Sequence, residues 1–182
     1  MLLVLWKWRW SALANPTYLD ELIEYKDRVV RTLAASQSVV GLLLNDPAID
    51  MECDAAYEVI GRNIYDFDYV DKTVERDDAY IMIDTELMAA SSGSMNRWYL
   101  YVQIVCAKPY NKLSGKVFKG VKGNRRDNLA REVDLLLNGQ TGYGIGRLDL
   151  IGAAPAQVPD TFTSILLTYE IHEFRQERMM YR

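Results

Sequence analysis

Few side chains in this 182-residue chain are of the kinds that perform catalysis or bind transition metals. The chain has one histidine, His172, and two cysteines, Cys53 and Cys106, which lie far apart in the sequence. A hydrolytic triad or a zinc site brings three or four such groups together, because a nucleophile needs a base and zinc needs its full ligand set. His172 stands in a strand-like segment with no partner placed for it. We therefore expect no catalytic residue and no zinc site.

Three aspartates, Asp66, Asp68 and Asp71, resemble the start of a calcium-binding loop. Such a loop also needs a glycine at its sharp turn and a distal glutamate as a bidentate ligand. The segment DFDYVD lacks both, and its interleaved aromatic residues are typical of a strand edge. The sequence therefore predicts no metal site here.

Two glycine patterns come close to nucleotide-binding motifs. The segment GYGIG at 142–146 follows an expected helix and begins none, whereas a dinucleotide site lies between a strand and a helix. The segment GKVFKG at 115–120 has the glycine spacing of a phosphate-binding loop, but Val121 stands where that loop requires lysine. We therefore expect no cofactor and no enzymatic activity.

Composition and charge exclude several classes of protein. Hydrophobic residues make up 49% of the chain and charged residues 25%, which is typical of a globular protein. The apolar run Leu2 to Trp6 is too short to span a bilayer or to act as a secretory signal, so we expect no membrane partner. A formal net charge of −4 argues against a general nucleic-acid binder, and two cysteines suit a reducing compartment.

The chain divides into an aromatic arm at 1–16 and a single domain at 17–182. Within the domain, apolar spacing predicts a first helix at 17–35, which breaks or ends near Gly41 and Pro47. It also predicts strands at 57–70, 77–87 and 98–108, a loop at 111–124, a helix at 125–139, a short strand after 142 and a last strand at 162–174. This order predicts an α+β fold, an antiparallel sheet packed against helices, with extended loops or arms.

The strand WYLYVQIVCAKPY is wholly apolar on one face and partly apolar on the other. One face carries Trp98, Leu100, Val102, Ile104 and Cys106, and the other carries Tyr99, Tyr101, Gln103 and Val105. One layer of helices covers only one face of a sheet. Twelve tyrosines and four tryptophans also fit a protein with interfaces, where such aromatics are enriched. We therefore expect the face with Tyr99 and Tyr101 to contact a partner or another subunit.

The loop at 111–124 is rich in lysine and glycine. Its four lysines, Lys112, Lys116, Lys119 and Lys122, could meet an acidic partner surface, or they could simply be solvated. Phe118 is expected to be exposed and to anchor the loop on a neighbouring subunit. On this interpretation, shortening the loop would cost few core contacts and leave the monomer folded.

Three segments in this order, WYLYVQIVCAKPY, RRDNLAREVDLLLNG and SILLTYEIHEF, resemble the tail terminator proteins of long-tailed bacteriophages. In that family an N-terminal helix and a strand pair precede a strand that opens with tryptophan and ends near proline, followed by a short helix and a last strand. The residues that match are Trp98, Pro109, Thr168, Tyr169, Ile171 and Glu173. The resemblance covers residues 17–174, and the arm at 1–16 and the long loop at 111–124 depart from the smaller members.

The resemblance implies a virion protein of the phage tail or neck, assembled in the host cytoplasm. It implies a homo-oligomeric ring, expected to be a hexamer, that caps the tail tube, stops its polymerisation and docks the head connector. DNA would pass through the lumen without specific binding, which the acidic charge permits because phosphate is repelled.

Two alternatives stay open. One is another head–tail joining or tail-completion protein, which a twelvefold ring would favour. The other is a small-ligand-binding or enzymatic α+β domain with its site under the loop at 111–124.

Overall fold

A computed structural model describes residues 18–67, 78–88, 95–143 and 145–174. The elements are α1 (Tyr18–Ala34), α2 (Gln37–Leu44), α3 (Asp54–Tyr57), β1 (Ile64–Tyr65), β2 (Ala79–Met88), β3 (Met95–Ala107), α4 (Arg125–Leu137), β4 (Ile145–Ala154) and β5 (Phe162–Phe174). This is the α+β fold that the sequence predicts. The aromatic arm at 1–16 lies outside the described residues.

The strands form one five-stranded sheet in the order β1-β2-β3-β5-β4. The long strands β2, β3, β5 and β4 pair antiparallel, and only the two-residue β1 runs parallel to its neighbour β2. The two strands that carry the phage resemblance, β3 and β5, pair along their full lengths at the centre of the sheet. β4 runs along one edge and is ten residues long, more than the short strand that the sequence predicts.

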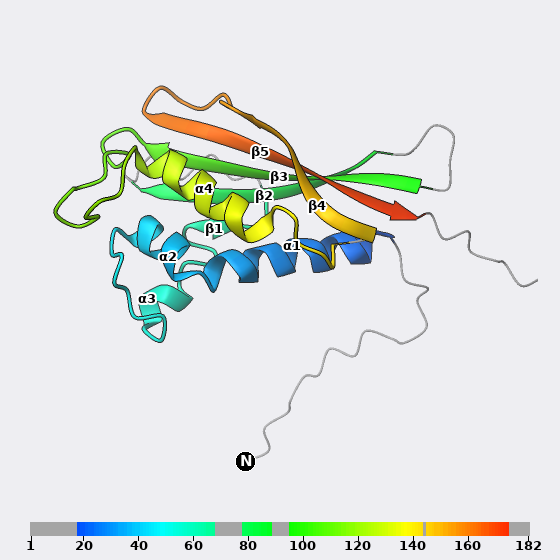
Figure 1. The fold of residues 1–182 in the computed structure, drawn as a ribbon, viewed down its shortest axis with the longest axis horizontal. Coiled ribbons are helices and arrows are strands. Elements are labelled where there is room, and N and C mark those ends of the chain that lie inside the picture. Colours follow the sequence, from blue (N-terminus) through cyan, green and yellow to red (C-terminus); the bar gives the residue numbers. More distant parts are fainter. Residues whose placement is uncertain (1–17, 68–77, 89–94, 144, 175–182) are drawn as a thin grey trace, which may run out of the picture.

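The helices cover one face of this sheet and build the core there (Figure 1). From β3, Trp98 and Leu100 point into this core, opposite Ile171 and Tyr169 of β5. Trp98 is fully buried. The helices contribute their apolar stripes, of which the buried members are Tyr25, Val29, Val30 and Leu33 from α1, Val39, Val40, Leu42 and Leu43 from α2, and Leu129, Ala130, Val133 and Leu137 from α4. The same periodicity that predicts these helices therefore forms the core.

The first helix ends where the sequence predicts, and the residues after it form a separate helix. α1 ends at Ala34, and Ser36 begins α2 as an N-cap whose side chain accepts from the Val39 backbone N–H. Gly41 lies inside α2 rather than at a break, and its role is close packing. A Cβ atom there would stand 2.7 Å from the backbone oxygen of Asp46, so only glycine lets the chain turn back so tightly.

The expected strand at 57–70 is mostly wrong. Tyr57 ends the short helix α3, and only Ile64 and Tyr65 form a strand among the described residues of this segment. The backbone N–H groups of Asn63 and Ile64 both donate to the Val59 carbonyl in a tight turn. Donors used within the turn cannot also pair with a neighbouring strand, so only Ile64 and Tyr65 of this segment join the sheet. Residues 68–70 lie outside the described residues.

Candidate functional site

The second face of the sheet has two parts. At one end Tyr80, Met82, Val105 and Phe162 form a small buried cluster, against which Val158 of the loop between β4 and β5 packs. Farther along β3, Tyr99, Tyr101 and Gln103 are only partly buried. Within the part of the chain that the structure describes, all the helices that pack on the sheet contribute to the core on its other face. This half of the second face is the surface where the sequence predicts a partner.

This surface is aromatic and polar, and it carries the carboxylates of Asp84 and Glu86, which lie opposite Tyr101 and Tyr99 in the strand pair β2–β3. The Tyr101 hydroxyl donates to the Glu86 carboxylate at 2.6 Å. This hydrogen bond, with burial as a second cause, raises the pKa of Tyr101 to about 12, so the phenol stays protonated near neutral pH. Beside it lies an open hollow of about 300 Å³, lined by Met82, Ile83, Asp84, Tyr101, Gln103 and Leu166. Its mixed lining fits side-chain contacts better than a shaped site for one small molecule.

The Lys-rich loop is ordered against its own domain, and one prediction about it is wrong. Lys112, Lys116, Lys119 and Lys122 are exposed, as expected. Phe118, however, is only 5% exposed and belongs to the hydrophobic core. Its backbone N–H donates to the Ser114 carbonyl in a turn, and the side chain packs inward. Phe118 therefore cannot be the exposed anchor, although a contact role for the lysines stays a prediction.

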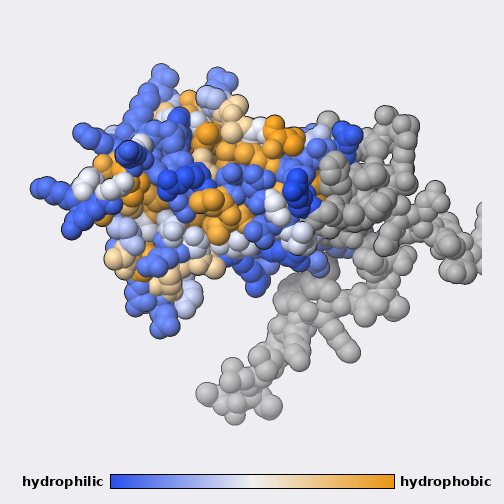
Figure 2. Space-filling view, viewed as in Figure 1, coloured by the Kyte–Doolittle hydropathy of each residue, from blue (hydrophilic) through white to orange (hydrophobic). Residues whose placement is uncertain are grey.

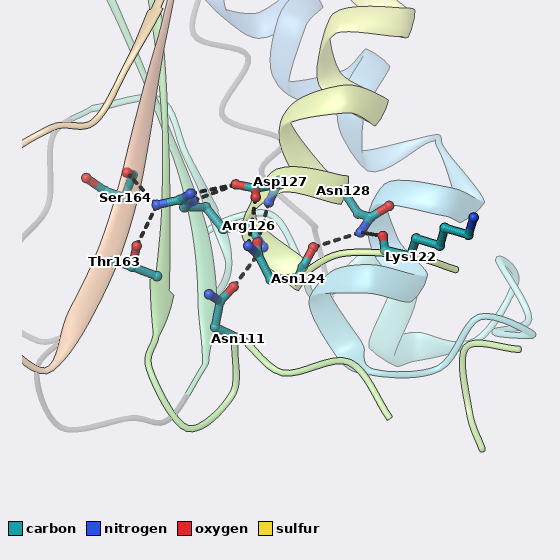
Figure 3. A network of polar contacts seen from close by, with 8 residues as sticks. All are labelled: Asn111, Lys122, Asn124, Arg126, Asp127, Asn128, Thr163 and Ser164. Atoms are coloured by element: carbon teal, nitrogen blue, oxygen red, sulfur yellow. Dashed lines mark hydrogen bonds and ion pairs between the residues drawn. The ribbon is translucent and has the colours of Figure 1, made fainter. Parts of the chain in front are cut away.

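A polar network fixes the point where this loop enters α4 (Figure 3). Asn124 is the N-cap of α4, and its side chain accepts from the Asp127 N–H at 2.8 Å. Asn111 accepts from the Arg126 N–H at 3.0 Å. The Arg126 guanidinium donates to the Asp127 carboxylate at 2.8 Å and to the Thr163 hydroxyl at 2.7 Å. The network ties both ends of the loop to α4 and β5.

The same network holds the backbone of the loop but does not include its lysine ammonium groups. The Asn128 side chain donates to the backbone oxygens of Lys122 at 2.9 Å and Asn124 at 2.7 Å. The Lys122 side chain points away from the network (Figure 3). The backbone of the loop is thus held while its charged side chains remain on the surface.

Arg125 is the residue that reasoning from sequence missed. It is 1% exposed, and its guanidinium donates to the Leu42 carbonyl, to Asn45 Oδ1 at 2.6 Å and to the Tyr110 carbonyl at 2.8 Å. It also stacks on the Tyr110 ring at 3.9 Å. Burial lowers the pKa of Arg125, since desolvation disfavours the charged form. In the sequence it is one of two adjacent arginines at a helix start, and nothing distinguishes it from its partly buried neighbour Arg126.

Cys106 of β3 is buried in the hydrophobic core, where its thiol is poorly reactive. Burial is the main cause that raises the pKa of its thiol from 9.0 to about 12. A thiol that stays protonated and enclosed is a poor nucleophile. Cys53 is only partly buried, and both cysteines are free.

We therefore expect Cys106 to react with a thiol reagent at least about a hundredfold more slowly than Cys53 at pH 8. Because the pKa of Cys106 is higher in the folded state, its contribution to stability is present below pH 9 and is lost as the pH rises towards 12. Mass spectrometry of the labelled protein, with a Cys53→Ser variant as control, measures the first effect. Equal labelling of the two thiols in the folded protein would contradict the burial of Cys106.

Groups that could hold a metal do not come together in the described part of the chain, where no cluster of three or more histidine, cysteine, aspartate or glutamate residues occurs. Asp66 lies exposed after β1, while Asp68 and Asp71 lie outside the described residues. Among the residues that the structure describes, none of the helices has the length and apolar character needed to cross a membrane.

Comparison with known families decides where the chain belongs. Residues 35–171, from just before α2 to within β5, match the sequence model of the YomW family. The chain belongs to the YomW family. The matched segment of this YomW-family protein includes the Lys-rich loop, Arg125 and both central strands.

Two further comparisons complete the picture. A chain from the solved virion of a native gene transfer agent particle is similar to this one, with 14% identity, a TM-score of 0.45, and coverage of 80% of this chain and 90% of that chain. A likeness at this level assigns no function. No curated protein matches the sequence.

Proposed function

We propose that this YomW-family protein is a structural protein of a phage-type virion and acts as a tail terminator. In this role a homo-oligomeric ring, expected to be a hexamer, caps the tail tube, stops its polymerisation and provides the docking surface for the head connector. DNA passes through the ring without specific binding. The protein works through its surfaces and performs no catalysis.

Family membership supports the coarser part of this proposal. The YomW family is phage-related, which favours a structural protein of a phage particle over an unrelated bacterial domain. The finer role rests on the resemblance to tail terminators, carried by Trp98, Pro109 and the ending of β5. Trp98 and the ending of β5 lie on the two central strands, which pair with each other, and Pro109 follows the end of β3.

The observation that supports the ring is the half of the second sheet face that no helix among the described residues covers. Tyr99 and Tyr101 lie there partly exposed, while the opposite face of the same strand is buried under helices. A ring built head to tail needs two different contact surfaces on each subunit. The face with Tyr99 and Tyr101 is one candidate for such a contact surface.

One alternative in the same assembly is another head–tail joining or tail-completion protein. It would use similar surfaces, and a twelvefold ring would favour it. The alternative of a ligand-binding or enzymatic domain placed its site under the loop at 111–124. Phe118 fills the space beneath that loop with its ring, which favours a packed core there over a ligand site.

The proposal is tested by removing the protein from a producing phage. Without the terminator, tube polymerisation lacks its stop, so we expect overlong tails that carry no heads, and the wild-type gene supplied in trans should restore normal particles. Electron microscopy of the lysate measures tail length and head attachment. Tails of normal length joined to heads in the null mutant would contradict the terminator role. Normal-length tails without heads would favour the joining alternative.

A further inference from the structure

Two surface segments of opposite charge project from the same end of the molecule (Figure 1). The first, the basic loop, spans residues 107–124 and contains no acidic residue. It carries five exposed lysines, Lys108, Lys112, Lys116, Lys119 and Lys122. The second, the acidic lobe, spans residues 45–60 around α3 and contains no lysine, arginine or histidine. It carries five exposed carboxylates, Asp46, Asp50, Glu52, Asp54 and Glu58.

Within the described chain few of these charged side chains form salt bridges. None of the five lysines takes part in a salt bridge to another described residue, and in the acidic lobe only Glu58 does, with Arg62 at 3.7 Å. The basic loop contacts α2 just before the acidic lobe begins, where the Tyr110 hydroxyl donates to the Leu43 carbonyl at 2.9 Å. The charged side chains of the two segments nevertheless form no ion pair with each other in the described structure. Figure 2 shows the hydrophilic side chains that protrude from this end.

Both segments combine charge with exposed apolar side chains. Val117 and Val121 on the basic loop are 37% and 39% exposed, and Tyr57 on the acidic lobe is 68% exposed. An apolar centre with a charged rim is the usual composition of a protein–protein interface. Because Phe118 and the network around Asn128 hold the loop backbone, a partner would meet a preformed surface and little ordering entropy would be lost.

We propose that the basic loop of one subunit binds the acidic lobe of a second copy of this chain. This proposal deepens the proposed function and rests on it, because a head-to-tail ring lets every subunit offer its loop to one neighbour and its lobe to the other. The equal numbers of opposite charges on one chain favour a second copy over a different protein. A purely acidic partner would explain the loop but would leave the acidic lobe without a role.

The contact requires several charges acting together. Isolated surface ion pairs contribute little free energy. Complementary clusters of charge, however, speed the association of two proteins and disfavour wrong orientations. Because the charges are exposed, salt screens them over about 8–10 Å at ordinary ionic strength. Assembly through this contact is therefore expected to weaken as salt is raised.

Charge reversal on each surface provides the test. The loop variant carries Lys116→Glu and Lys119→Glu, and the lobe variant carries Glu52→Lys and Asp54→Lys. The swap variant carries all four changes. The control, Glu24→Lys, reverses an exposed charge on α1, outside both surfaces. Sedimentation velocity of the purified full chain at low and high salt measures assembly, and circular dichroism checks that each variant is folded.

We expect the wild type and the control to assemble at low salt, and the loop and lobe variants to assemble at least about tenfold more weakly. An equimolar mixture of these two variants should assemble again, because the acidic loop of one meets the basic lobe of the other. The swap variant should also assemble by itself.

Three outcomes would overturn the proposal. They are a wild type that remains monomeric at low salt, single-surface variants that assemble like the control, and recovery in the swap variant but not in the mixture. The last result would place the contact within one chain. Overlong, headless tails in the null mutant together with any of these outcomes would leave the terminator role standing and remove only this contact.

Discussion

Replacing Arg125 with alanine is expected to lower the free energy of unfolding by about 3–5 kcal/mol. The change removes donors to the Leu42 carbonyl, the Asn45 side chain and the Tyr110 carbonyl, and it leaves a void beside the Tyr110 ring. These acceptors belong to the end of α2 and to the segment after β3, so one side chain joins two distant parts of the chain.

Arg125→Lys should also destabilise the protein, by about 1–3 kcal/mol, because one ammonium group cannot match the fork of the guanidinium. Arg131→Ala is the matched control, since Arg131 is exposed on the same helix, and should change stability by less than about 0.5 kcal/mol. Denaturant unfolding followed by circular dichroism measures all three. Equal stability of Arg125→Ala and Arg131→Ala would show that the buried contacts contribute nothing.

Phe118→Ala is expected to cost about 3–5 kcal/mol, the usual range for truncating a buried phenylalanine. Phe118 is 5% exposed and packs in the core beside the Arg125 guanidinium, which lies 5.5 Å from the ring centre. Val121→Ala in the same loop removes a side chain that is 39% exposed and should cost less than about 1 kcal/mol. Shortening the whole loop should therefore destabilise the monomer, contrary to the expectation from sequence.

The same denaturant measurement tests this prediction against its alternative. If Phe118→Ala unfolds at the wild-type denaturant concentration but assembles more weakly, then the Phe118 side chain lies on the surface as an anchor and is not packed in the core. If Phe118→Ala unfolds earlier and Val121→Ala does not, the loop is part of the core.

The sequence predicted the long elements because their signals are local. Apolar residues at every second position predict β3 and the last strand at 162–174. An apolar stripe and the Asn138–Gly139 stop predict α4. These elements supply most of the core, so the fold class could be inferred from them.

The errors arose where contacts distant in sequence decide the structure. Phe118 looks like a surface residue among lysines and glycines, and only the return of the loop onto the core buries it. Arg125 looks like any arginine at a helix start until α2 is placed beside it. The segment 57–65 has strand-like residues, but its turn at Val59–Ile64 takes up the backbone donors. Pairs of surfaces on different copies leave still weaker signals, and the interface roles of Tyr99, Tyr101 and the loop lysines stay predictions.

A ring at the end of the tail tube can be seen by locating the protein on tails. A tagged copy that restores the null mutant can be labelled and imaged on particles by electron microscopy. We expect one ring of label per tail, at the end of the tube that joins the head, with sixfold symmetry in averaged end views. Label along the whole tube, label at the distal tip, or particles without label would contradict it.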